Sequence, residues 1–107
     1  MLERAVTDWM RLTNASLTTE GALDGVREET VELFTAQTPE EIAHEAGDVI
    51  IRLAELIVVT GFHVEPIIQE TLIKLYTKYP PHVVGGLMDS GMTRPEAMAH
   101  QKTLWEK

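Results

Sequence analysis

Two pairs of carboxylates stand at matching spacings in the first half of the chain. Glu29 and Glu32 lie three residues apart in "EETVELF", and Glu45 and Asp48 lie three apart in "HEAGDVIIRL". Side chains three residues apart share one face of an α-helix. The short connection "QTPEE" predicts that the two helices are antiparallel neighbours. The two pairs should therefore face each other across one groove.

Four carboxylates at close range cannot all stay ionised unless a cation lies among them. The chain has no cysteine, and no obvious set of histidines accompanies these acids. Ligation by oxygen alone favours a hard ion, Mg²⁺ or Mn²⁺. Either pair by itself would be typical of a solvated helix face. Two pairs flanked by apolar surfaces predict a metal site with Glu29, Glu32, Glu45 and Asp48 as ligands.

Composition narrows the class of protein. A chain of 107 residues suggests a single domain over 1–107, and its 44% apolar and 24% charged residues are ordinary for a globular protein. The formal net charge of −8 argues against a nucleic-acid backbone or an anionic membrane as partner. The apolar run 49–59 is too short, and too interrupted by Arg52 and Glu55, to span a bilayer. We expect a cytoplasmic protein.

Hydrophobic spacing predicts an all-α fold, with a four-helix core and a short C-terminal helix. Helices are expected at about 2–12, 23–36, 39–60, 64–79 and from 94 to the C-terminus. Thr38, Pro39 and Glu41 predict a capped start for the third helix, and "TRPE" repeats this pattern before the last one. The stretches "TNASLTTEGALDG" and "HVVGGLMDSGM" are predicted to be irregular.

The third predicted helix is apolar on two sides. One face, expected to pack in the core, holds Ile42, Ala46, Val49, Leu53, Leu56 and Ile57; the other holds Ile51, Ala54 and Val58. A helix that is apolar on two sides is packed on two sides. Because a chain this short leaves little to cover the second face, we expect self-association, for which a two-fold dimer is the commonest form.

The acidic motifs resemble those of the all-α nucleoside triphosphate pyrophosphohydrolases of the MazG type. Their pattern is E-x-x-E, a spacer, then E-x-x-D, and "EAGDVI" is similar to the family's "EELGDVL". "KLYTKYPPHVVGG" and "RPEAMAHQKTLWEK" resemble later segments of the family, so the resemblance covers most of 20–107. It implies a four-helix core assembled as homodimers or homotetramers, Mg²⁺ on the four matching acids, and hydrolysis of a nucleoside triphosphate to monophosphate and pyrophosphate.

Roles for individual residues come partly from the resemblance and partly from the residues themselves. Lys74 and Lys78 look like the family's basic pair and would contact the substrate phosphates, although Lys78 and Tyr79 stand where two arginines are common. One of the acids, with Glu32 and Glu45 as the candidates, would orient the attacking water. Trp9 either packs in the core beside Val6 or stacks on a nucleobase.

Other functions stay open at this stage. A phosphoribosyl-ATP pyrophosphatase or a dimeric dUTPase-like hydrolase would share the same acid pattern. A non-catalytic helical interaction protein would use the apolar faces and need no metal. No motif in the sequence identifies the base or the sugar of a substrate.

Overall fold

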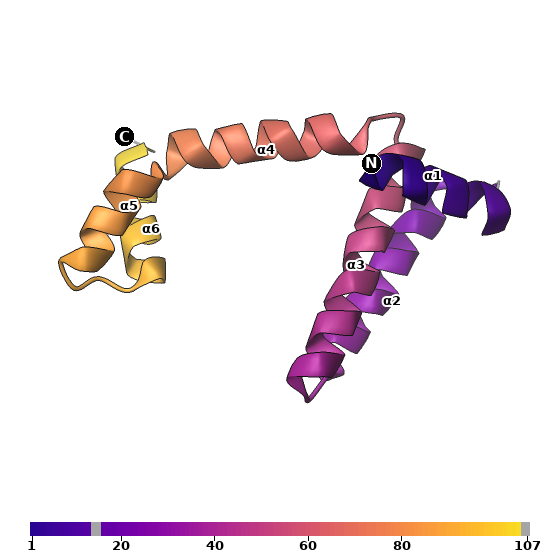
Figure 1. The fold of residues 1–107 in the computed structure, drawn as a ribbon, viewed down its shortest axis with the longest axis horizontal. Coiled ribbons are helices and arrows are strands. Elements are labelled where there is room, and N and C mark those ends of the chain that lie inside the picture. The colour runs from indigo at the N-terminus through magenta and orange to yellow at the C-terminus, as the bar shows by residue number, and fades with distance from the viewer. Residues whose placement is uncertain (14–15, 106–107) are drawn as a thin grey trace. The chain divides into compact units, whose positions relative to one another are not determined.

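The computed structural model describes residues 1–13 and 16–105, and in this part of the chain all regular structure is α-helical (Figure 1). The all-α prediction is therefore confirmed. The described part of the chain holds six helices: α1 (Leu2–Thr13), α2 (Thr19–Thr35), α3 (Pro39–Val59), α4 (Val64–Lys78), α5 (Pro81–Asp89) and α6 (Arg94–Trp105).

Two stretches expected to be irregular are partly helical. The second helix begins at Thr19 rather than near Leu23, because the Thr18 hydroxyl accepts a hydrogen bond from the Gly21 N–H at 3.0 Å and caps it. Helix α5 occupies much of "HVVGGLMDSGM". Its glycines suggested a loop, but Pro81 is preorganised for the first turn of a helix. Residues 14–15 and 106–107 of the predicted segments lie outside the described residues.

The predicted helix boundaries at Thr38, Gly61 and Thr93 are confirmed. Thr38 Oγ1 accepts from the Glu41 N–H at 3.1 Å, and Thr93 Oγ1 accepts from the Glu96 N–H at 3.3 Å. Gly61 follows α3 with a φ of 90°, a left-handed conformation in which a side chain would be strained. Each of these helix ends depends on residues within one turn, so a short sequence pattern is enough to predict it.

Internal contacts group the chain into two compact units, Met1–Ile67 and Ile68–Lys107, with the boundary inside α4. The first unit holds α1, α2, α3 and the start of α4. In the second, α5 packs against α6, and Ala97 is fully buried. The prediction of one domain over the whole chain stays a prediction, and each unit is considered by itself below.

The core of the first unit lies between α1, α3 and the start of α4. Its buried members are Val6, Ala54 and Val64, with Val58 packed against them. Helix α1 therefore covers part of the α3 face that was expected to lack a cover within the chain. The other apolar face, which was expected to form the core, is only partly covered. Ile57 packs against this core, whereas Ile42 is 46% exposed and Leu53 is 42% exposed.

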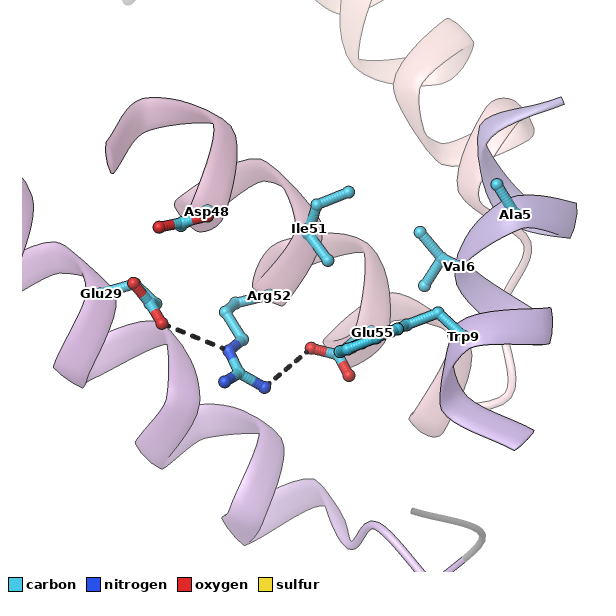
Figure 2. A pocket seen from close by; sticks show the side chains of 8 residues that line it. All are labelled: Ala5, Val6, Trp9, Glu29, Asp48, Ile51, Arg52 and Glu55. Atoms are coloured by element: carbon cyan, nitrogen blue, oxygen red, sulfur yellow. Dashed lines mark hydrogen bonds and ion pairs between the residues drawn. The ribbon is translucent and has the colours of Figure 1, made fainter. Parts of the chain in front are cut away.

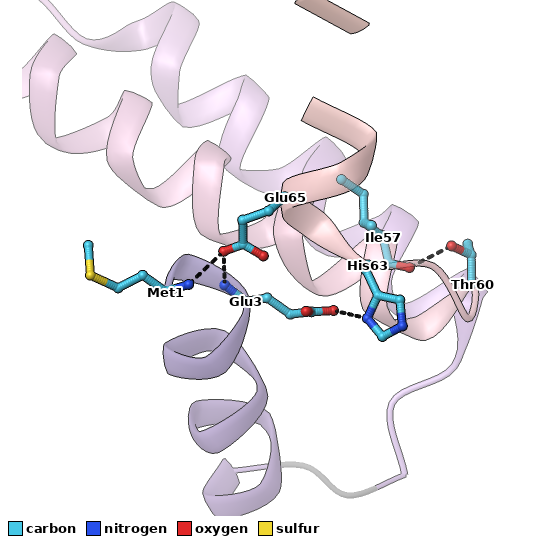
Figure 3. A network of polar contacts seen from close by, with 6 residues as sticks. All are labelled: Met1, Glu3, Ile57, Thr60, His63 and Glu65. Atoms are coloured by element: carbon cyan, nitrogen blue, oxygen red, sulfur yellow. Dashed lines mark hydrogen bonds and ion pairs between the residues drawn. The ribbon is translucent and has the colours of Figure 1, made fainter. Parts of the chain in front are cut away.

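A polar network ties the start of α1 to the turn between α3 and α4 (Figure 3). Glu65 Oε1 accepts from the Glu3 backbone N–H at 2.9 Å and from the Met1 ammonium at 3.0 Å. The Glu3 carboxylate in turn lies 2.9 Å from His63 Nδ1. The hydrogen bond from the Glu3 N–H, followed by that from the ammonium, lowers the pKa of Glu65 to about 2.

Replacing Glu65 with glutamine should loosen α1. A carboxylate whose pKa falls from 4.5 to about 2 on folding stabilises the protein above pH 4.5, and this contribution is lost as the pH falls toward 2. Glu65→Gln should lower the melting temperature at pH 7 by a few degrees and flatten the acid side of the profile. Thermal melts from pH 7 to pH 2.5 measure both effects. The exposed-site control Glu28→Gln should follow wild type, and a Glu65→Gln profile identical to wild type would contradict the proposed contribution.

Candidate metal centre

The four predicted carboxylates come together between α2 and α3. One ligand oxygen from each of Glu29, Glu32, Glu45 and Asp48 lies within 4.8 Å of the others. The two helices are side by side, joined by a connection of three residues (Figure 1). The antiparallel hairpin thus turns two spacings of three residues into one cluster, as the sequence predicts.

Two oxygens of the cluster are buried without a hydrogen-bond partner among the described residues. They are Glu29 Oε2 and Glu45 Oε2, one from each helix. A buried acceptor that loses water and gains no donor costs about 1–3 kcal/mol, and more when the group is charged. Coordination of a cation would remove this cost at both oxygens. The four acids therefore fit a metal ion better than they fit an unliganded polar surface.

The electrostatics of the cluster disfavour four negative charges. Burial of its side chain raises the pKa of Glu29, and the charges of Glu32 and Asp48 raise it further. Without a cation, the folded protein holds this proton more tightly than the unfolded chain does. Metal-free stability therefore declines as the pH rises from 4.5 through the raised pKa, which is the reverse of the behaviour of Glu65. A bound cation would favour the ionised form.

Arg52 partly offsets the negative charge from one side (Figure 2). Its Nε lies 3.6 Å from Glu29 Oε1, and its Nη1 donates to Glu55 Oε1 at 3.1 Å. Helical spacing offers Arg52 either Asp48 or Glu55 as a partner, and the structure shows Glu55. The contact with Glu29 crosses to another helix. Gly25 on α2 makes room for it, since a Cβ there would lie 3.2 Å from Arg52 Cδ.

A cavity of about 390 Å³ adjoins the cluster (Figure 2). Glu29 and Asp48 line it together with Arg52, Glu55 and side chains of α1 that include Trp9. By helical spacing Glu55 lies on the same narrow polar stripe of α3 as Glu45 and Asp48, and it is only 4% exposed. The helical period of α3 could not predict that Glu55 is buried. Its burial beside this cavity depends on α1, which comes from the start of the chain and makes one wall of the cavity.

The basic pair lies on another part of the chain. Lys74 and Lys78 belong to α4 within the second unit, and Lys78 Nζ lies 5.5 Å from the centre of the Tyr79 ring. Their contact with substrate phosphates stays a prediction. The assignment of a water-orienting role to Glu32 or Glu45 also stays a prediction.

Oxygen donors alone make up the cluster, which suits Mg²⁺ or Mn²⁺ among common ions.

Comparisons with family models, curated proteins and solved structures find no match to this chain. No helix in the described part of the chain is both long and apolar enough to cross a bilayer. The functional proposal therefore rests on the chain's own residues and on the resemblance of its acidic motifs.

Mg²⁺ should raise the melting temperature, because a ligand that binds only the folded state stabilises it by mass action. Glu45→Gln keeps the shape of the side chain but removes a charge from the cluster, so it should remove most of the Mg²⁺-dependent increase while the fold persists. Differential scanning fluorimetry across a Mg²⁺ titration measures this increase. Glu28→Gln, on the same helix as Glu29 but outside the cluster, should respond like wild type. An undiminished increase in Glu45→Gln would show that Glu45 is not a significant ligand.

Proposed function

We propose that this protein is a Mg²⁺-dependent nucleoside triphosphate pyrophosphohydrolase that serves nucleotide-pool housekeeping in the cytoplasm. The observation that carries the proposal is the set of four carboxylate oxygens within 4.8 Å of one another. Glu29 and Glu45 each have a buried oxygen to which no described residue donates a hydrogen bond. A site with this much negative charge would bind a cation before it bound any anionic substrate. A polyphosphate is the substrate class that such a cation would recruit.

All four acids would hold the ion, and they differ in how far solvent reaches them. Glu29 and Glu45 are partly buried, while Glu32 and Asp48 are exposed. When bound, Mg²⁺ would neutralise phosphate charge and activate a water for attack. Glu32 and Glu45 are our candidates for the carboxylate that orients this water and accepts its proton.

The position of the cut comes from the motif resemblance. In pyrophosphohydrolases of the MazG type, to which "EETVELF" and "HEAGDVIIRL" are similar, the α–β anhydride breaks. Hydrolysis there adds water across the bond and releases nucleoside monophosphate and pyrophosphate. Lys74 and Lys78 are the proposed phosphate contacts. The alternatives are a phosphoribosyl-ATP pyrophosphatase, a dUTPase-like hydrolase and a helical interaction protein without activity.

The proposal includes a homodimer or homotetramer. Exposed apolar side chains on the hairpin support it, since monomers rarely leave large apolar patches open. On α3, Ile42, Ile50 and Leu53 share one side by helical spacing, and each is more than 40% exposed. On α2, Phe34 is 82% exposed. A second copy of the hairpin would cover such a surface with an identical one.

Product analysis tests the reaction. With Mg²⁺ and a panel of ribo- and deoxyribonucleoside triphosphates plus phosphoribosyl-ATP, ³¹P NMR should show monophosphate and pyrophosphate. Asp48→Asn removes one charge beside the ion and should lower turnover by about 100-fold or more, because charge stabilisation provides most of the acceleration. The control Asp24→Asn lies on α2 outside the cluster and should stay active. Diphosphate and orthophosphate as the only products would contradict the α–β assignment, and no product from any substrate would favour the interaction protein.

Ile50→Glu tests the assembly. A charge placed on the open face of α3 should be costly to bury against a second copy. Wild type should be a dimer or tetramer at micromolar concentration, and the variant should shift toward monomer in multi-angle light scattering. Thr7→Glu, an exposed site on α1, serves as the control. A wild-type monomer under these conditions would rule out the proposed assembly.

A further inference from the structure

The cavity beside the acidic cluster has two chemically different sides (Figure 2). Trp9 and Ala5 of α1, with Ile51 of α3, form an apolar wall. Glu29 and Asp48 stand at the cluster, while Glu55 lies further along α3. The indole of Trp9 is 51% exposed, so it does not serve as a core side chain. Of the two roles that the sequence leaves open for Trp9, stacking on a ligand fits this exposure.

The dimensions suit a nucleoside attached to phosphates at the cluster. Asp48 and Glu55 are seven residues apart on α3, which is about two turns or roughly 10 Å along the axis. A polyphosphate at the acids would therefore place the attached sugar and base along the helix, toward Trp9 and Glu55. A flat aromatic base can stack on an indole face, and such stacking does not depend on the identity of the base.

Glu55 provides the selective group in this cavity. The side chain is buried, and Arg52 donates to its Oε1 at 3.1 Å. This hydrogen bond leaves Oε2 able to accept from a ligand. An ionised carboxylate accepts hydrogen bonds and donates none. Amino groups on bases are donors, whereas the O4 atoms of uracil and thymine are acceptors that a carboxylate repels.

We propose that this cavity is the base subsite of the protein, with Trp9 stacking on the base and Glu55 accepting a hydrogen bond from its amino group. The inference rests on the proposed function and specifies its substrate class. Triphosphates of cytosine, adenine or guanine should be substrates in preference to those of uracil and thymine. A dUTPase-like activity would then be disfavoured, because Glu55 repels the O4 atom of uracil.

A base-free substrate separates this subsite from the metal site. Wild type is assayed with Mg²⁺ on nucleoside triphosphates of all five bases and on inorganic tripolyphosphate. The amino-bearing bases should show kcat/KM about 10-fold or more above uracil and thymine. Uracil and thymine have no amino group to donate to Glu55, and their N3–H lies beside an O4 atom that the carboxylate repels.

Two variants test the named residues. Trp9→Leu keeps an apolar wall but removes the stacking face, so kcat/KM for the preferred nucleotide should fall about 10-fold or more while tripolyphosphate hydrolysis is unchanged. Phe62→Leu, at an exposed aromatic residue outside this cavity, should change neither value. Glu55→Gln introduces an amide donor, so the preference for amino-bearing bases over uracil should fall about 10-fold or more.

The outcomes distinguish the two proposals. Equal losses on nucleotides and tripolyphosphate in Trp9→Leu would overturn the base subsite, as would a wild-type preference for uracil or thymine or no base preference. If no triphosphate is hydrolysed, the proposed reaction fails, and the subsite is tested by titrating nucleoside monophosphates against tryptophan fluorescence. Quenching by CMP, AMP or GMP that is lost in Trp9→Leu would support the subsite, and its absence would overturn it. If Glu55→Gln does not fold, the Trp9→Leu comparison and the base preference of wild type still test the proposed base subsite.

Discussion

The repulsion among four carboxylates held within 4.8 Å is the constraint on which the first unit depends. Packing of α2 against α3 removes water from an oxygen of Glu29 and one of Glu45, and the described residues supply no donor in its place. Arg52 reaches Glu29 from one side only. Such an arrangement is destabilising by itself and becomes favourable when a cation lies among the acids. A cation bound among these four acids would therefore stabilise the hairpin of α2 and α3.

One chain of contacts connects this point with the neighbouring cavity. The missing side chain at Gly25 lets Arg52 lie against α2, where it contacts Glu29 and also donates to Glu55. Helix α1 closes the apolar side of the cavity, and the Glu65 network holds the start of that helix. A change in how α1 packs would therefore alter the cavity without touching the acids. Of the helices that line the cavity, α1 carries none of the four acids.

Much of the fold and of the candidate site could be predicted from local patterns. The caps at Thr38 and Thr93 and the stop at Gly61 depend on residues within one turn. The acid cluster follows from two short spacings and one short connection, so it was predictable as well. Helix α5 was not, because its glycines indicated a loop while Pro81 favoured a helix start. The expected core face of α3 is confirmed only in part, because Ile57 packs against the core while Ile42 and Leu53 are exposed. Helical period alone cannot rank two apolar faces.

The sequence by itself determined which side chains share a helix face and which helices are neighbours, because these depend on a few adjacent residues. It therefore specified the four acids as one group. Only the tertiary structure decided that α1 covers Ala54 and Val58 while Ile42 and Leu53 stay open, and that Glu55 is buried beside Trp9. These outcomes depend on contacts between residues more than forty positions apart. The free energy of such packing is a property of the assembled surfaces, which no single stretch of sequence contains.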